Sequence, residues 1–174
     1  MPNEDRRRKV LIVDDEERNI KLMIAALKNY GYDFETAKNG VEAIEKTKTF
    51  TPDIILLDVM MPEMDGYETC KRLKEDSGTS HIPVVMVTSL SDMDSKISGL
   101  EKGADDFLTK PVDTTELIVR TRNLLKVKEF EDFLKQHNEL LEEEVKRKTA
   151  ELRESYIDTI HKLTRIAEYK DEDT

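Results

Sequence analysis

The sequence has one cysteine and no tryptophan among 174 residues, and only 6% of its residues are aromatic. A single cysteine excludes an internal disulfide and any metal site built from several thiolates, so we interpret Cys70 as an ordinary helix residue. No run approaches the roughly 18 apolar residues of a membrane span. Residues 1–8 also lack the apolar stretch of a secretory signal. We therefore expect a cytoplasmic protein with no membrane association.

Basic residues are scarce relative to acidic ones. The chain has 28 Lys and Arg against 38 Asp and Glu, which gives a net charge of −10. A negative field repels the phosphates of nucleic acids and anionic lipids, so we expect no direct nucleic-acid binding. The charged fraction of 38% is high and the hydrophobic fraction of 37% is low for a globular chain. Together with the length, this predicts one compact domain plus an appendage that buries little.

Proline and glycine are missing from the last third of the chain. All five prolines and all six glycines lie at or before residue 111, and about half of residues 128–174 are charged. A long segment without turn residues favours a helix. We therefore divide the chain into a domain over residues 8–127 and a helical stalk over residues 128–170.

Short apolar runs alternate with helical patterns in the domain. The runs at residues 9–13, 54–57 and 84–87 are too short for helices and are rich in β-branched residues, which predicts buried strands. Weaker strands fit residues 33–37 and 105–108. Strands that are apolar on both faces belong in a parallel sheet covered by helices on both sides. Five β/α units result.

Turn and cap residues mark the expected ends of the intervening helices. The pair Tyr30-Gly31 is typical of a helix end, and the pairs Asn39-Gly40 and Asp65-Gly66 are typical of helix starts. The sequence 113–116, Asp-Thr-Thr-Glu, resembles a capping box that opens the fifth helix.

Polar residues follow four of the five expected strands. Asp14 and Asp15 follow the first, Asp58 the third, Thr88 the fourth and Lys110 the fifth. In an open parallel sheet these strand ends meet at one edge, where ligands bind. Three carboxylates together need a cation, and oxygen ligands suit Mg²⁺, with Mn²⁺ as the alternative.

This arrangement also predicts phosphoryl chemistry. With a metal ion bound, one carboxylate can attack phosphorus and form an acyl phosphate. Lys110 can then hold a phosphoryl oxygen, and the Thr88 hydroxyl can donate to another. These considerations alone leave open which aspartate is the nucleophile.

Four segments together resemble one known family. They are Asp14-Asp15, residues 56–66 (LLDVMMPEMDG), residues 87–89 (VTS) and residues 107–111 (FLTKP). In this order they are similar to the receiver domain of two-component response regulators, and the similarity runs from about residue 8 to residue 127. The resemblance implies a flavodoxin-like (βα)5 fold with a doubly wound parallel sheet of strand order 2-1-3-4-5.

The resemblance also implies a role for each site residue. Asp58 would accept a phosphoryl group from a sensor histidine kinase or a phosphotransfer protein. Asp14, Asp15, Asp58 and the main-chain carbonyl of Met60 would hold Mg²⁺. Thr88 and Phe107 would form the switch pair, and Lys110 would grip the phosphate. The Lys110-Pro111 peptide bond is expected to be cis.

Two positions that tune the phosphoryl lifetime in this family carry apolar residues here. Met60 stands two residues beyond Asp58, and Leu90 stands two residues beyond Thr88. Because neither side chain orients water well, we hypothesise an acyl phosphate that persists for minutes or longer.

Three alternative sites carry less weight. An aspartyl-nucleophile phosphatase of similar build usually has a second aspartate two residues after the first, where this chain has Met60. Accordingly, we expect no enzymatic activity apart from transfer of a phosphoryl group to the protein itself and its later removal by the same protein. Met60, Met61 and Met64 lack the Cys or His neighbours of a soft-metal site. His161 is not followed by the acidic residue and proline typical of a kinase phosphoacceptor, and His81 and His137 stay unassigned.

The stalk shows an apolar repeat of seven residues. Val145, Leu152, Thr159 and Ile166 occupy one core position, and Thr149, Tyr156, Leu163 and Lys170 occupy the other. Apolar residues between 130 and 141 follow a shifted frame, which predicts a stutter near 141–145. We predict a parallel coiled-coil homodimer that relays the change at the switch pair. A single solvated helix is the alternative.

The end of the chain resembles a second family. Residues 163–174 are similar to the entry into an HD-GYP domain, the cyclic-di-GMP phosphodiesterase family, and the chain contains no His-Asp pair. Residues 171–174 would then begin a missing output domain, or form a disordered end. On this interpretation, the chain is the receiver and stalk of a longer regulator without its catalytic part. The alternative is a stand-alone regulator that acts by partner binding through its coil.

Overall fold

The computed structural model describes residues 6–89 and 103–171. The chain divides into two compact units, Met1–Phe130 and Glu131–Thr174. The first unit contains all the strands of the described residues, and the second is occupied by one helix. The expected fourth helix, Leu90 and residues 172–174 lie outside the described residues.

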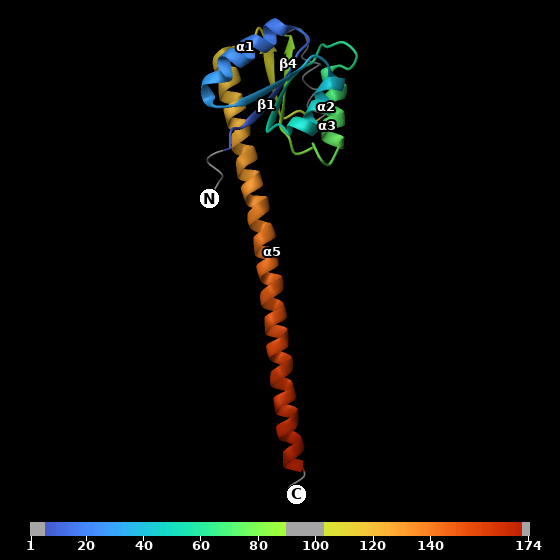
Figure 1. Ribbon diagram of the computed structural model, residues 1–174, viewed down its shortest axis with the longest axis vertical. Coiled ribbons are helices and arrows are strands. Elements are labelled where there is room, and N and C mark those ends of the chain that lie inside the picture. Colours follow the sequence, from blue (N-terminus) through green and yellow to red (C-terminus); the bar gives the residue numbers. More distant parts are fainter. Residues whose placement is uncertain (1–5, 90–102, 172–174) are drawn as a thin grey trace. The chain divides into compact units, whose positions relative to one another are not determined.

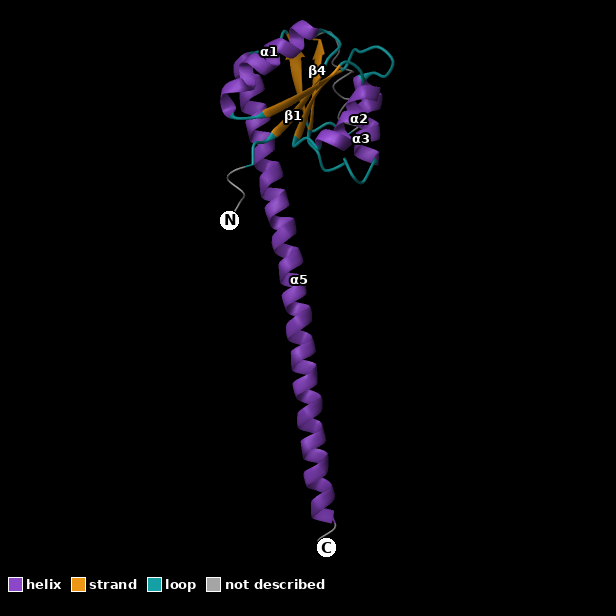
Figure 2. Cartoon of the chain, in the orientation of Figure 1, coloured by secondary structure: helices purple, strands orange, loops and turns teal. Residues whose placement is uncertain are grey.

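The first unit is built on a sheet of five parallel strands in the order β2-β1-β3-β4-β5 (Figures 1 and 2). This confirms the predicted doubly wound topology of a flavodoxin-like fold. The strands are β1 Lys9–Val13, β2 Asp33–Ala37, β3 Ile54–Asp58, β4 Val84–Ser89 and β5 Asp106–Lys110.

Three strands extend beyond the apolar runs that predicted them. β3 includes Asp58, β4 continues to Ser89, and β5 is Asp106–Lys110 rather than 105–108. The reason is that main-chain pairing does not stop where side-chain polarity changes. Asp58 pairs with Val87, and Ser89 pairs with Lys110. The polar residues are therefore held in the sheet itself and not in free loops.

The described helices are α1 Glu17–Leu27, α2 Gly40–Phe50, α3 Gly66–Glu75 and α5 Thr114–Asp171, with a short 3-10 helix at Lys28–Tyr30. Three of them, α2, α3 and α5, begin where the local signals predict. The side chains of Asn39, Asp65 and Asp113 each accept a 2.8 Å hydrogen bond from the main-chain N–H three residues on. Gly31, at φ +73°, ends the 3-10 helix in the left-handed conformation.

Two apolar layers hold the helices to the sheet. α1 and the first turns of α5 cover one face, and α2 and α3 cover the other (Figure 1). Alternate residues of β1 point to opposite layers: Val10 and Ile12 face α1 and α5, and Leu11 and Val13 face α2 and α3. Cys70 is buried in α3 within the second layer, as expected of an ordinary helix residue.

The second unit is the remainder of α5, and its apolar side chains face solvent in the single chain. Val145, Leu152, Tyr156, Leu163 and Ile166 are all more than half exposed. Among the described residues, no helix has both the length and the apolar character needed to cross a membrane.

Candidate functional site

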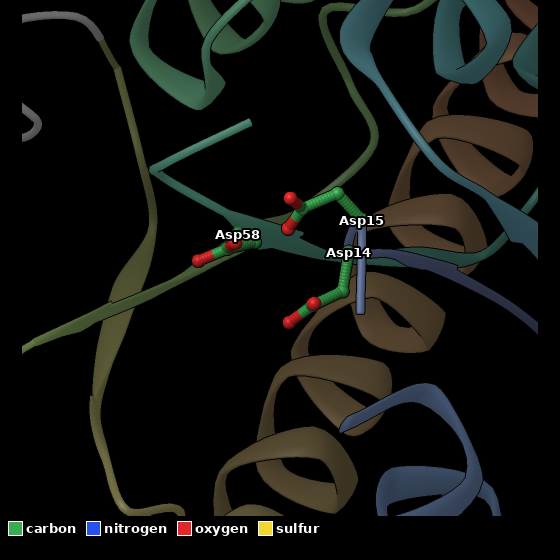
Figure 3. Close-up of side chains that lie close together, drawn as sticks. All are labelled: Asp14, Asp15 and Asp58. Atoms are coloured by element: carbon green, nitrogen blue, oxygen red, sulfur yellow. The ribbon is translucent and has the colours of Figure 1, made fainter. Parts of the chain in front are cut away.

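Three aspartates meet at the carboxyl ends of β1 and β3. Asp14 and Asp15 follow β1 directly, and Asp58 is the last residue of β3. Each offers a carboxylate oxygen, and these oxygens all lie within 4.8 Å of one another (Figure 3). Asp14 and Asp58 are buried, whereas Asp15 is exposed. Two of the three carboxylates are therefore shielded from solvent, and the cluster is open to solvent on the side of Asp15.

Asp14 is fixed by donors from the start of α1. The main-chain N–H of Glu16 donates to Asp14 Oδ1 at 2.8 Å, and Asn19 Nδ2 lies 3.1 Å from both oxygens. Sequence reasoning missed this role for Asn19, because an asparagine in the first turns of a helix is usually a surface residue. Its position five residues after Asp14 was the available signal.

Lys110 joins two of the carboxylates. Its Nζ lies 3.0 Å from Asp14 Oδ2 and 2.9 Å from Asp58 Oδ1, and it comes from the end of β5. Burial works against the Lys110 charge, but the hydrogen bonds to Asp58 and Asp14 outweigh it and raise the pKa of the ammonium. The Lys110-Pro111 peptide bond is cis, which confirms the prediction.

Asp58 is held in an environment that disfavours its charge. Burial raises the pKa of the Asp58 carboxyl above its usual 3.8, and the nearby Asp14 charge adds to this effect. The hydrogen bond and the charge of Lys110, and a hydrogen bond from the Met60 main-chain N–H, act in the opposite direction but do not cancel it. Additional positive charge at this position would therefore stabilise the carboxylate.

The donor set suits a hard divalent cation. All three candidate ligands are carboxylate oxygens, and the exposed Asp15 leaves room for water or a further ligand. This donor set fits the Mg²⁺ that the resemblance to receiver domains implies. The Met60 side chain is 74% exposed and takes no part in the cluster. The predicted role of its main-chain carbonyl stays a prediction.

Gly66 brings the start of α3 directly against Asp58. Its N–H donates to the carbonyl oxygen of Val59 at 2.9 Å. A Cβ atom at this position would lie 2.8 Å from Val59 Cα and still closer to the Asp58 carbonyl oxygen. The sequence marked Gly66 only as part of a helix start, since a close approach between backbones leaves no local pattern.

Thr88 lies on β4, the strand next to β3, and Phe107 lies on β5, the strand on the far side of β4. Thr88 follows Val87, the partner of Asp58, and it is buried. Its hydroxyl donates only a 3.5 Å hydrogen bond to the Ser89 carbonyl, which is at the limit for such a bond. Phe107 pairs with Met86 in the sheet and is partly buried against the layer under α2 and α3.

The structure thus brings Asp14, Asp15, Asp58 and Lys110 together, and it places Thr88 beside the strand that ends in Asp58. His137 and His161 lie in the second unit, on α5. His81 lies in the loop before β4. None of the three belongs to the cluster.

Comparison with curated proteins gives two informative relatives. Response regulator PleD of Caulobacter vibrioides is 48% identical over 128 residues, which cover 74% of this chain and 28% of PleD. A protein of Vibrio cholerae named as a probable cyclic di-GMP phosphodiesterase is 37% identical over 165 residues, which cover 95% of this chain and 37% of that protein. The chain therefore spans well under half of the length of either relative.

Solved structures agree with the fold. A putative response regulator from Chloroflexus aurantiacus superposes with a TM-score of 0.67 at 36% identity, covering 70% of this chain and 99% of that one. Chemotaxis response regulator CheY4 of Vibrio cholerae gives a TM-score of 0.64 at 32% identity, covering 68% and 99%. The model of the response regulator receiver domain matches residues 10–122. The chain therefore belongs to the response regulator receiver family of two-component signalling systems.

Proposed function

We propose that Asp58 accepts a phosphoryl group from the phosphohistidine of a sensor histidine kinase in a Mg²⁺-dependent step. The observation that carries this proposal is the pairing of Lys110 with both Asp58 and Asp14 inside the cluster of three carboxylates. In this proposal, a nucleophile, a cation site and a phosphate-binding ammonium would lie together at one edge of the sheet.

The surroundings of the three aspartates favour Asp58 as the nucleophile. Both oxygens of Asp14 already accept hydrogen bonds from Asn19, and Lys110 and the Glu16 N–H take one oxygen each. Asp15 is exposed, where an acyl phosphate would be open to water. Asp58 is buried beside the ammonium of Lys110 and the open side of the cluster.

In the proposed step, an oxygen of Asp58 attacks phosphorus, the P–N bond breaks, and its electron pair returns to the imidazole of the kinase. Lys110 would then move its hydrogen bonds to the phosphoryl oxygens, and the Thr88 hydroxyl would donate to another. Asp14, Asp15, Asp58 and the Met60 carbonyl would hold Mg²⁺, or Mn²⁺ in its place. The bound ion would offset the negative charge between carboxylates and phosphate.

A phosphatase acting on other molecules is not favoured. Enzymes of that kind usually carry a second aspartate two residues after the nucleophile, and this position is the exposed thioether of Met60. The same thioether is a poor hydrogen-bond acceptor. It would not orient an attacking water molecule, so we expect the phosphoryl group on Asp58 to last for minutes or longer. A half-life of a few seconds with Mg²⁺ present would contradict this.

We further propose that Thr88 and Phe107 act as the switch pair and that α5 carries the change onward. In this assignment the receiver covers residues 8–127, and residues 128–170 form a parallel coiled-coil homodimer. The similarity to the Vibrio cholerae protein continues into α5 and covers 95% of this chain. This extent supports an output domain of the cyclic di-GMP phosphodiesterase kind, joined through the helix, over a stand-alone regulator.

The test is labelling with a small acyl phosphate in the presence of Mg²⁺, followed by intact mass. We expect one phosphoryl group on the wild type and none on Asp58→Asn, with Asp33→Asn as a control for loss of a half-buried aspartate outside the cluster. Lys110→Met should slow labelling about a hundredfold, the usual effect of removing one charge-stabilising donor. Chelation of Mg²⁺ should prevent labelling. Persistent labelling of Asp58→Asn would overturn the assignment.

A further inference from the structure

A group of charged residues at the opposite edge of the sheet plays no part in the proposed chemistry. The segment before β1 is fixed there through its main chain. The carbonyl oxygen of Arg8 accepts from the Asp33 N–H at 2.8 Å, and the N–H of Lys9 donates to Asp53 Oδ2 at 2.8 Å. These two hydrogen bonds hold the main chain at Arg8 and Lys9 beside the amino ends of β2 and β3.

The Arg8 side chain spans two carboxylates on different elements. Its Nη1 lies 3.6 Å from Asp53 Oδ1, and its Nη2 lies 3.3 Å from Glu129 Oε1. Asp53 precedes β3 and its side chain is 8% exposed, whereas that of Glu129 on α5 is 47% exposed. A guanidinium has donors on two separate nitrogen atoms and can hold two carboxylates at once. The result is a bridge from the base of the sheet to α5.

The bridge meets α5 where its packing against the sheet ends. The buried face of the helix consists of Leu117, Thr121, Leu125 and Lys128. Glu129 is the next residue, and the first compact unit ends at Phe130. Without an additional contact, the last turn of a packed helix is prone to local opening, because few buried groups hold it.

We propose that Arg8 is a positioning residue for signal relay: by bridging Asp53 to Glu129 it ties the last receiver turn of α5 to the base of the sheet. A change at the switch pair then reaches residue 131 and beyond because the helix moves as one piece. Without the bridge, the last packed turn of α5 would open locally and absorb the change. This inference rests on the proposed phosphorylation of Asp58 and on relay through α5.

The chain offers matched variants for a test. Glu129→Gln removes the helix end of the bridge and leaves the Arg8 pairing with buried Asp53 in place. Glu131→Gln is its control, since Glu131 is an exposed glutamate on the same helix. Arg8→Gln removes the whole bridge. Its control is Arg7→Gln, because Arg7 pairs with half-buried Asp33 on β2.

The measurement is hydrogen exchange of α5 amides in the full chain, with and without Mg²⁺ and beryllofluoride, beside the labelling assay for Asp58. We expect Glu129→Gln and Arg8→Gln to speed exchange at residues 125–130 about threefold, in line with a partly exposed ion pair. We also expect them to lose at least half of the beryllofluoride-dependent change beyond residue 131. The two controls should behave as the wild type, and all four variants should label at the wild-type rate.

Three results would overturn the inference. The first is a beryllofluoride-dependent change beyond residue 131 that survives in Glu129→Gln and Arg8→Gln, because the bridge would then be only a local support. The second is equal effects in the control variants. The third is a wild type that labels normally but shows no change beyond residue 131. Absence of labelling in the wild type would instead be a failure of the proposed function.

Discussion

The buried carboxylate of Asp58 should make the unphosphorylated fold less stable near neutral pH. Its pKa is raised in the folded protein, chiefly by burial, so the folded state binds this proton more tightly than the unfolded state does. The contribution of Asp58 to stability is therefore greatest at low pH and is lost as the pH rises through the folded pKa. A cation bound beside Asp58 would favour its carboxylate and offset this loss of stability.

We therefore predict that Asp58→Asn increases the free energy of unfolding near neutral pH in Mg²⁺-free buffer. The gain should shrink as the pH falls through the raised pKa toward 3.8, the usual value. Urea denaturation at a series of pH values measures this gain, with Asp33→Asn as a control at a half-buried aspartate outside the cluster. A variant that is equally stable or less stable than the wild type at neutral pH would contradict this prediction.

A second residue-scale prediction concerns Thr121 on α5. Its side chain is fully buried, and within the described residues its hydroxyl has no hydrogen-bond partner. An unsatisfied buried hydroxyl costs about 1 to 3 kcal/mol, so Thr121→Val should raise the free energy of unfolding by about 1 kcal/mol. Thr47 is the matched control, because it is buried in α2 and its hydroxyl donates to the Ala43 carbonyl at 2.7 Å.

Thr47→Val should therefore lower the free energy of unfolding by about 1 kcal/mol, since it leaves a buried carbonyl with one partner fewer. Both changes keep a β-branched residue in a helix, so helix propensity cancels in the comparison. Urea denaturation measures both variants. A loss of stability in Thr121→Val like that in Thr47→Val would contradict the prediction that the Thr121 hydroxyl is unsatisfied.

The sequence predicted the site residues that directly follow a recognisable strand pattern. It missed the site residues whose role depends on how distant segments pack together. Asp14 and Asp58 end apolar strands, so the strand pattern alone places them at one edge. Lys110 was expected to bind phosphate, but its pairing with Asp14 joins residues 96 positions apart and has no local signature. Asn19 was missed for a related reason, since its role depends on how α1 leaves β1.

At the scale of elements, helix starts were more predictable than strand ends. The caps at Asn39, Asp65 and Asp113 need only residues within one turn, and all three are present. The Glu116 side chain, expected to complete a capping box, instead accepts a hydrogen bond from Arg120. Strand ends depend on the neighbouring strand. For this reason β4 and β5 continue past their apolar runs.

The start of α3 gives the prediction at this scale. Gly66→Ala should lower the free energy of unfolding by about 1 to 3 kcal/mol, because its new Cβ would overlap the Asp58 carbonyl and the Val59 backbone. It should also slow labelling of Asp58 by displacing the end of β3. Gly78→Ala is the control, since its Cβ would meet only Asp76 Oδ1 at 3.3 Å. Equal stability of the two variants, measured in urea, would contradict this close approach.

For the whole molecule, the exposed apolar side chains of the second unit predict a partner. The helix continues to Asp171, and in proteins most of the stability of a helix comes from packing of an apolar face. Its apolar side chains are exposed in the single chain, and burying each is worth about 1.5 to 3 kcal/mol. The sequence predicted the helix because helical periodicity is local. The seven-residue repeat predicts a coiled coil, but the repeat does not by itself show which helix is the partner.

We predict that the protein is a dimer of about twice its 20.2 kDa mass through the seam at Val145, Leu152, Tyr156, Leu163 and Ile166. Leu152→Glu would put two carboxylates into that seam and should yield a monomer. Ile157→Glu is the control, because Ile157 is also exposed but lies beside the seam.

Light scattering with and without Mg²⁺ and beryllofluoride measures the mass. A dimer in both states would mean that helix geometry carries the signal, whereas a dimer only with beryllofluoride would mean that phosphorylation controls assembly. A wild-type monomer in both states would contradict the coiled coil.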